Sequence, residues 1–117
     1  MGDAQTPLWF KWAMSQKPKS HIVDVDDCGI HYYLWEGSST EPKKGGLLFV
    51  HGGGGHAHWW SFLAPFFTKD YRVAALDLSG MGNSGRREEY SAEVRSAELL
   101  RVIQEAKLGD NTFVIGH

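Results

Sequence analysis

The sequence predicts an α/β fold in which an N-terminal antiparallel hairpin leads into a mostly parallel sheet flanked by helices. Two short runs rich in β-branched and aromatic residues come first, and three continuous apolar runs follow, separated by helix-like patterns. Apolar runs without alternation are typical of strands buried on both faces, as in parallel sheets. We therefore expect an aromatic arm at residues 1–20 and one core domain over residues 21–117.

The predicted hairpin consists of residues 21–26 and 30–36, joined by Asp27-Cys28-Gly29. In its second strand the residues alternate between two faces that are both largely apolar or aromatic, so we expect both faces to be covered. Residues 37–46 contain Pro42 and two lysines, and they are expected to form a polar loop.

The three apolar runs are residues 47–50, 73–76 and 113–115. The first helix is expected between the first two runs, because apolar residues there repeat at the spacing of one helix face: Trp59, Phe62, Leu63, Phe66 and Phe67. The second helix is expected over residues 92–108, with Ser91 as its N-cap and Gly109 just past its end. Its inner stripe is Leu99, Val102, Ile103 and Ala106.

Composition excludes several classes of protein. The chain has 117 residues, of which 42% are hydrophobic and 22% charged, as in an ordinary globular domain. A net charge of −2 gives no field for collecting nucleic acid or anionic lipid. Cys28 is the only cysteine, so an internal disulfide is excluded and a cytoplasmic location is expected. Early lysines interrupt the N-terminal apolar residues, so neither a signal peptide nor a membrane span is expected.

A glycine run follows the first apolar strand, in the order His51-Gly52-Gly53-Gly54-Gly55. Glycines at a strand-to-helix turn let backbone amides converge on one point, and the helix dipole adds positive potential there. This pattern predicts a site for an anion, or for an oxygen that becomes one during a reaction.

Two chemistries fit such a loop. Residues 52–57 match the dinucleotide pattern G-x-G-x-x-A, and Asp77 lies 20 residues past Ala57, where a ribose-binding acid would stand. The alternative is an oxyanion hole for acyl transfer, in which loop amides stabilise a tetrahedral intermediate.

Three features favour acyl transfer. His51 stands directly before the glycines, where its ring would crowd a pyrophosphate. A hairpin before the glycine-bearing strand is foreign to a dinucleotide fold, whose fingerprint follows its first strand. The third apolar run leads into Gly116-His117, which is the opening half of the G-x-S-x-G nucleophile elbow.

With these motifs in this order, the sequence resembles the α/β-hydrolase family. The family's His-Gly turn matches His51-Gly52-Gly53, and its fifth strand leads into a G-x-S-x-G elbow, of which Gly116-His117 is present here. Its Asp-x-x-Gly-x-Gly-x-Ser motif after the fourth strand matches residues 77–84. The resemblance covers residues 21–117 and implies an α/β-hydrolase core.

The resemblance also implies roles for individual residues. The Gly53 amide would be one oxyanion donor, with Gly54 as the neighbour to consider. The turn and loop residues would be structural, namely His51, Gly52, Asp77, Ser84, Gly116 and His117. The family's nucleophile, second oxyanion donor, catalytic acid and histidine base all come after residue 117.

Three nearby histidines raise the question of a metal site, because His51, His56 and His58 have H-x4-H-x-H spacing. No cysteine stands near them, and His31 is the only internal candidate for a further ligand, so we expect no metal and no cofactor. We expect instead that His56, His58, Trp59 and Trp60 line the mouth of the substrate pocket.

A sheet that ended at the elbow would leave an apolar, unpaired edge, so we expect other residues or a second polypeptide to complete the fold. Three explanations are open: a shortened chain, a cut before the nucleophile, or a modified residue at that position. A cut is chemically feasible, because a serine hydroxyl can attack the preceding carbonyl to give an ester that hydrolyses.

The sequence therefore predicts a serine hydrolase that cleaves an ester, lactone, thioester or related bond of a small molecule. A closely related alternative is a hydrolase with aspartate as the nucleophile, as in dehalogenases and epoxide hydrolases. Two further alternatives are a nicotinamide-dependent reductase and a non-catalytic receptor built on the hydrolase fold.

Overall fold

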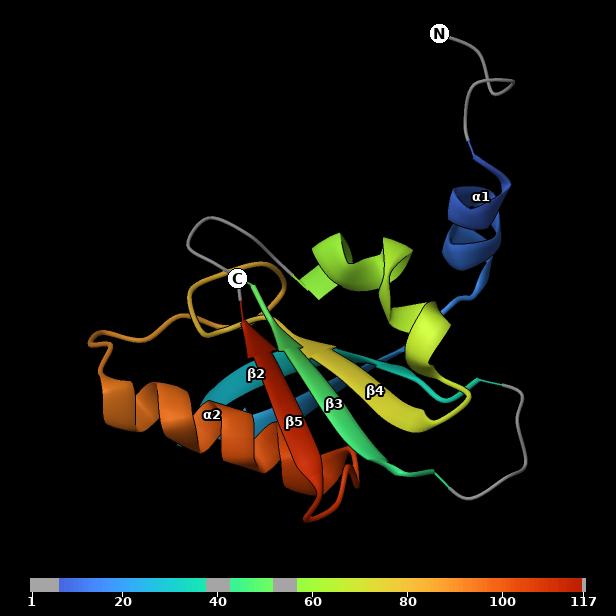
Figure 1. Cartoon of the computed structure of the whole chain (residues 1–117). Helices are drawn as coiled ribbons and strands as arrows, with labels where there is room; N and C mark the ends of the chain where they lie inside the picture. Colours follow the sequence, from blue (N-terminus) through green and yellow to red (C-terminus); the bar gives the residue numbers. More distant parts are fainter. Residues whose placement is uncertain (1–6, 38–42, 52–56, 117) are drawn as a thin grey trace, which may run out of the picture.

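The computed structural model describes residues 7–37, 43–51 and 57–116, apart from the side chain of Trp59. Its five strands form one mixed sheet in the order β1-β2-β4-β3-β5 (Figure 1). The strands are β1 Lys19–Val25, β2 Cys28–Trp35, β3 Gly45–Val50, β4 Tyr71–Leu76 and β5 Thr112–Gly116. β2 pairs antiparallel with β1 and β4, whereas β3 is parallel to β4 and β5. The predicted α/β sheet is confirmed.

The N-terminal hairpin is confirmed, but its turn is not where the sequence placed it. Val25 pairs with Cys28, so the turn residues are Asp26 and Asp27, whose φ angles are +47° and +63°. Two-residue hairpin turns of this kind need positive φ at both central positions, which aspartate tolerates better than most residues. The predicted connection through Cys28 and Gly29 is therefore wrong, because both residues belong to β2.

The helices cover the two faces of the sheet. α2 (Ala92–Glu105) packs on one face, and the 3₁₀ segments η2 (Ala57–Phe62) and η3 (Ala64–Phe67) lie on the other (Figure 1). The predicted single helix across residues 59–67 is wrong. Pro65 stands in the first turn of η3, and proline has no N–H to continue a helix.

Helix α2 matches its prediction at the start. The Ser91 hydroxyl accepts the Val94 N–H at 3.1 Å, which is an N-cap hydrogen bond. The helix ends at Glu105, three residues earlier than expected, because Lys107 takes a left-handed φ of +57°. Val102 and Ala106 are buried and pack against β1, β2, β3 and β4, as the predicted stripe required.

The short helix α1 (Leu8–Ser15) precedes β1 and lies near η2 and η3 (Figure 1). The Trp12 and Phe66 rings are 5.0 Å apart between centroids, and the indole of Trp35 donates to the Gln16 carbonyl at 3.2 Å. Within the described residues, no helix is long and apolar enough to cross a bilayer.

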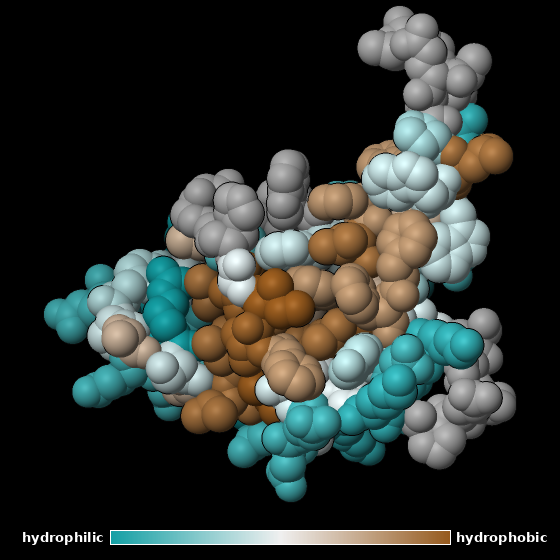
Figure 2. Space-filling model, in the orientation of Figure 1, coloured by the Kyte–Doolittle hydropathy of each residue, from teal (hydrophilic) through white to brown (hydrophobic). Residues whose placement is uncertain are grey.

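Strand β5 forms one edge of the sheet. We expected its apolar residues to be buried on both faces, but Phe113, Val114 and Ile115 are 53%, 51% and 37% exposed. The expectation is wrong for this strand because, among the described residues, its side chains belong to neither buried core cluster, and β3 is the one strand that pairs with it. Figure 2 shows apolar residues gathered in the middle of the face where β5 and β3 lie in Figure 1.

Candidate functional site

The carboxyl ends of three parallel strands meet at one edge of the sheet. Val50, the last residue of β3, is in register with Leu76 of β4 and with Gly116 of β5. These three strand ends therefore lie side by side. Residues 52–56 and His117 lie outside the described residues, so Gly52, Gly53, Gly54 and His56 have no described geometry.

The residue before the glycine run is tied to the segment after β4. His51 is 4% exposed, and its Nε2 accepts the backbone N–H of Leu78 at 3.2 Å. This bond links the residue that follows β3 to the loop after β4.

Ala57, two residues after the run, is tied to the same place. Asp77 is 1% exposed, and its Oδ1 accepts the backbone N–H of Ala57 at 2.6 Å. Its Oδ2 accepts the N–H of Asn83 at 3.1 Å and a hydrogen bond from His31 Nδ1 at 2.7 Å. Gly82 takes φ of +50°, and a Cβ there would lie 2.3 Å from Asp77 Cγ, so only glycine fits against this carboxylate.

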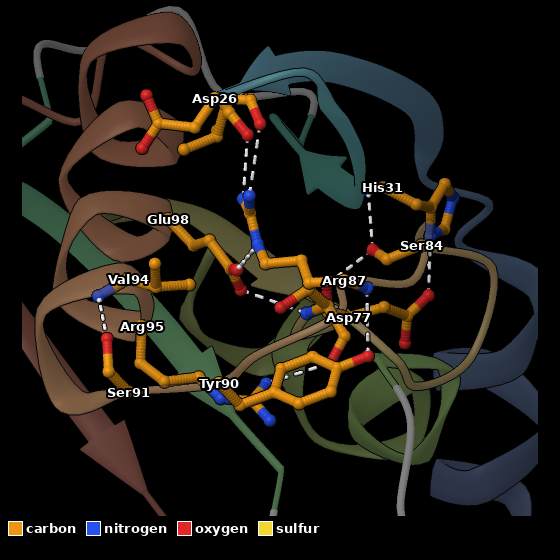
Figure 3. Close-up of polar contacts among 12 residues, drawn as sticks. Asp26, His31, Asp77, Ser84, Arg87, Tyr90, Ser91, Val94, Arg95 and Glu98 are labelled. Atoms are coloured by element: carbon orange, nitrogen blue, oxygen red, sulfur yellow. Dashed lines mark hydrogen bonds and ion pairs between the residues drawn. The ribbon is translucent and has the colours of Figure 1, made fainter.

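Ser84 closes the loop that Asp77 begins. Its hydroxyl donates to the Asp77 carbonyl at 2.5 Å and accepts the His31 N–H at 2.8 Å (Figure 3). The Gly80 N–H donates to the Gly85 carbonyl at 2.7 Å. The 77–85 loop is thus held both within itself and to strand β2.

A buried ion pair fixes the other side of this loop, and sequence reasoning missed it. Glu98 of α2 is fully buried and accepts from Arg87 Nε at 3.0 Å and from the Ser79 N–H at 2.9 Å. Arg87 also donates to the carbonyl of Asp26 in the hairpin turn (Figure 3) and to that of Val25 at the end of β1. The only sequence signal was a glutamate on the inner side of an amphipathic helix.

A cavity of about 290 Å³ opens next to Asp77. It is lined by Tyr33, His58, Asp77, Gly82 and Asn83. His58 is exposed, and its Nδ1 lies 3.2 Å from the Ser61 hydroxyl.

Trp60 lies in a different environment from His58. It is 7% exposed and stacks on Phe49 with a centroid distance of 4.6 Å, so its ring belongs to the core on this face. The side chain of Trp59 lies outside the described part of the chain.

Two pKa shifts occur in side chains that do not line this cavity. Burial raises the pKa of Tyr32, and nearby Glu105 adds to the effect. A hydrogen bond from Arg72 lowers the pKa of Glu36. Among the described residues, no group of three His, Cys, Asp or Glu side chains is placed to hold a metal ion.

This arrangement agrees with a family model. Residues 46–117, more than half of the chain, match the model of the alpha/beta hydrolase fold. The chain belongs to the alpha/beta hydrolase family. The expected family and the expected alpha/beta-hydrolase fold are therefore confirmed.

Individual known proteins resemble the chain over most of its length. An esterase of Mycobacterium tuberculosis is 34% identical over 101 residues, which are 85% of this chain and 31% of that protein. The Cif epoxide hydrolase from Acinetobacter nosocomialis superposes with a TM-score of 0.74 at 26% identity, covering 100% of this chain and 38% of its own.

A thioesterase domain from the curacin biosynthetic pathway superposes with a TM-score of 0.67 at 31% identity, covering 86% of this chain and 35% of its own. The chain thus spans about a third of the length of the relatives that it matches.

Proposed function

We propose that the protein is a serine hydrolase that cleaves an ester, lactone, thioester or related acyl bond of a small molecule. The observation that carries the proposal is the double anchoring of the glycine run. His51 before it and Ala57 after it are both hydrogen-bonded to residues 77–78 at the carboxyl end of the sheet. An oxyanion hole works only when its donors are fixed before the reaction.

In the proposed reaction, a serine that follows His117 attacks the carbonyl carbon, and a histidine from the rest of the protein takes its proton. The negative oxygen of the tetrahedral intermediate would accept a hydrogen bond from the Gly53 N–H, with the Gly54 N–H as the second candidate donor in the same run. The structural residues would hold the turns after β3 and β5 and the loop after β4 in place. They are His51, Gly52, Asp77, Ser84, Gly116 and His117. No cofactor is required for this chemistry.

The cavity beside Asp77 supports an acyl pocket in this position. Tyr33 and His58 are the aromatic and imidazole side chains of its wall, and it opens beside the segment that follows the glycine run. We infer that His58 contacts substrate and that His56 and Trp59 lie near it. Trp60 would then support the pocket from the core, where it stacks on Phe49.

The names of the relatives point the same way. Two of the matched proteins are called an esterase and a thioesterase domain, both of which act on acyl bonds. The proposal extends that reaction class to the protein that carries this chain.

Hydrolysis of p-nitrophenyl esters by the full-length protein tests the proposal. The acyl chain should be varied from acetate to octanoate, and the control is the variant in which alanine replaces the residue after His117. We expect turnover by the wild-type protein and a loss of at least about 10³-fold in kcat in that variant. Turnover that survives the substitution would contradict the proposal, as would NADPH binding without any hydrolysis.

A second candidate is an epoxide hydrolase with an aspartate nucleophile. It is favoured by the superposition on the Cif epoxide hydrolase, which covers the whole of this chain. Styrene oxide separates the two candidates. An aspartate enzyme would open the epoxide and leave p-nitrophenyl esters nearly untouched, whereas the serine hydrolase would do the reverse.

A further inference from the structure

Three polar side chains form a hydrogen-bonded relay from the edge strand of the sheet to its carboxyl end. The Ser20 hydroxyl of β1 lies 2.6 Å from His31 Nε2 of β2, and His31 Nδ1 lies 2.7 Å from Asp77 Oδ2. His31 and Asp77 are 3% and 1% exposed, and they are 46 residues apart in sequence. Figure 3 shows the imidazole of His31 directed at the Asp77 carboxylate.

The backbone holds the two buried members of the relay together. The Asp77 N–H donates to the His31 carbonyl at 2.9 Å, and the Ser84 hydroxyl bridges the His31 N–H and the Asp77 carbonyl. His31 is also fixed by its cross-strand pairing with Ile22. The imidazole is therefore placed against the carboxylate by two strands and a loop.

The hydrogens of the relay follow from its chemistry. An ionised carboxylate only accepts hydrogen bonds, so His31 Nδ1 carries the hydrogen that faces Asp77. The opposite nitrogen, Nε2, then accepts from the Ser20 hydroxyl or donates to it, and a hydroxyl serves either case. Ser20 thus gives the second ring nitrogen of His31 a hydrogen-bond partner in either case.

The Asp77 carboxylate is the link to the glycine run. Its Oδ2 takes the His31 hydrogen bond, while its Oδ1 takes the Ala57 N–H, directly after residues 52–56. A carboxylate that lost its bond to His31 could rotate about the Cβ–Cγ bond, and the Ala57 amide would then lose its acceptor. A shift of about 1 Å in an oxyanion donor is enough to cost roughly 10²-fold in rate.

We propose that His31 is a positioning residue for the oxyanion loop, acting through the Asp77 carboxylate, with Ser20 completing the relay. The role of the loop in catalysis rests on the proposed hydrolase function. The Ser-His-Asp order of the relay resembles a catalytic triad, but Ser20 is not among the residues that line the cavity. The geometry therefore assigns these side chains to support of the loop.

The experiment compares His31→Phe, which removes both ring nitrogens, with His31→Asn, whose amide can still donate near the Nδ1 position. His21→Phe is the matched control, because His21 lies in the same hairpin and its ring stacks on Tyr32 at 5.2 Å, away from Asp77. We expect His31→Phe to lower kcat of the full-length protein for p-nitrophenyl butyrate by about 10- to 100-fold, with KM within about twofold. His31→Asn should recover most of kcat, and His21→Phe should leave it unchanged.

A double-mutant cycle tests whether His31 acts through Asp77. If it does, His31→Phe together with Asp77→Asn should lower kcat no further than Asp77→Asn alone. Losses that multiply would overturn the proposal. Ser20→Ala should lower kcat by about threefold or less, because it leaves the bond between His31 and Asp77 in place.

Hydrogen exchange gives a readout that does not depend on turnover. We expect the Ala57 amide to exchange at least about tenfold faster in His31→Phe than in the wild type, with global stability matched by choice of temperature. If wild-type protein hydrolyses no ester but Ala57 still exchanges faster, the relay stands and the hydrolase proposal fails. Unchanged kcat and unchanged Ala57 exchange would refute the relay, and so would covalent fluorophosphonate labelling of Ser20.

Discussion

The buried Arg87–Glu98 pair offers a sharp test of how the 77–85 loop is held. The Arg87 side chain is 10% exposed and that of Glu98 is 0% exposed, so both charges are nearly removed from water. Arg87→Met keeps the length of the side chain but leaves the Glu98 carboxylate buried without its cation. Breaking a buried pair in this way costs about 3–5 kcal/mol.

The loss in free energy of unfolding also depends on which hydrogen bonds the remaining partner keeps in each variant. Glu98→Gln keeps an acceptor for the Ser79 N–H, and Arg87 keeps its bonds to the hairpin carbonyls, so we expect that variant to cost only about 1–2 kcal/mol. The double variant leaves no unpaired buried charge. It should therefore cost less than the sum of the single changes, with a coupling of about 1–3 kcal/mol.

The assay is urea unfolding of the full-length protein, followed by tryptophan fluorescence and circular dichroism. A control is Arg101→Met, because Arg101 pairs with Glu105 on the exposed side of α2 and should cost less than about 0.5 kcal/mol. The reasoning is refuted if Arg87→Met costs under about 1 kcal/mol, or if the two changes are additive within about 0.5 kcal/mol.

Three further predictions concern stability, each measured by urea unfolding. Ser91→Ala removes the N-cap bond to Val94 and should lower the free energy of unfolding by about 1 kcal/mol, whereas Ser91→Asp should not. Leu48→Ala opens a cavity at a fully buried position and should cost about 2–5 kcal/mol, against under about 1.5 for Leu48→Met. The Arg72 hydrogen bond lowers the pKa of Glu36 below 4.5. The free energy of unfolding of the wild type should therefore exceed that of Glu36→Gln by up to about 0.5 kcal/mol above pH 4.5. This difference should vanish as the pH falls through the lowered pKa of Glu36.

The elements that local patterns specify were predictable from the sequence. Continuous apolar runs identified β3 and β4 because both of their faces are covered, and Ser91 marked the start of α2 because its hydroxyl caps the first turn. The 3.6-residue period over residues 59–67 was misleading, because the same spacing also fits two short 3₁₀ segments that are separated at Leu63, with Pro65 in the first turn of the second. For β5, an apolar run alone does not indicate whether other elements pack against the two faces of the strand.

The site itself was only partly predictable. The motif around Asp77 marked a loop, yet nothing in the local sequence indicates that its carboxylate meets His31, because that contact joins residues 46 positions apart. The same holds for Glu98, whose partner Arg87 comes from the loop and not from its own helix. Such long-range polar contacts depend on the packing of strands and helices, which a one-dimensional pattern does not contain.

Labelling by a fluorophosphonate probe tests the central claim most directly. The full-length protein is treated with the probe, and the modified residue is located by mass spectrometry of its peptides. If the protein is a serine hydrolase with its oxyanion loop at residues 52–55, we expect one label, on a serine that directly follows His117. We also expect heat denaturation to abolish the labelling. An unlabelled protein, or a label confined to any other residue, would contradict the account.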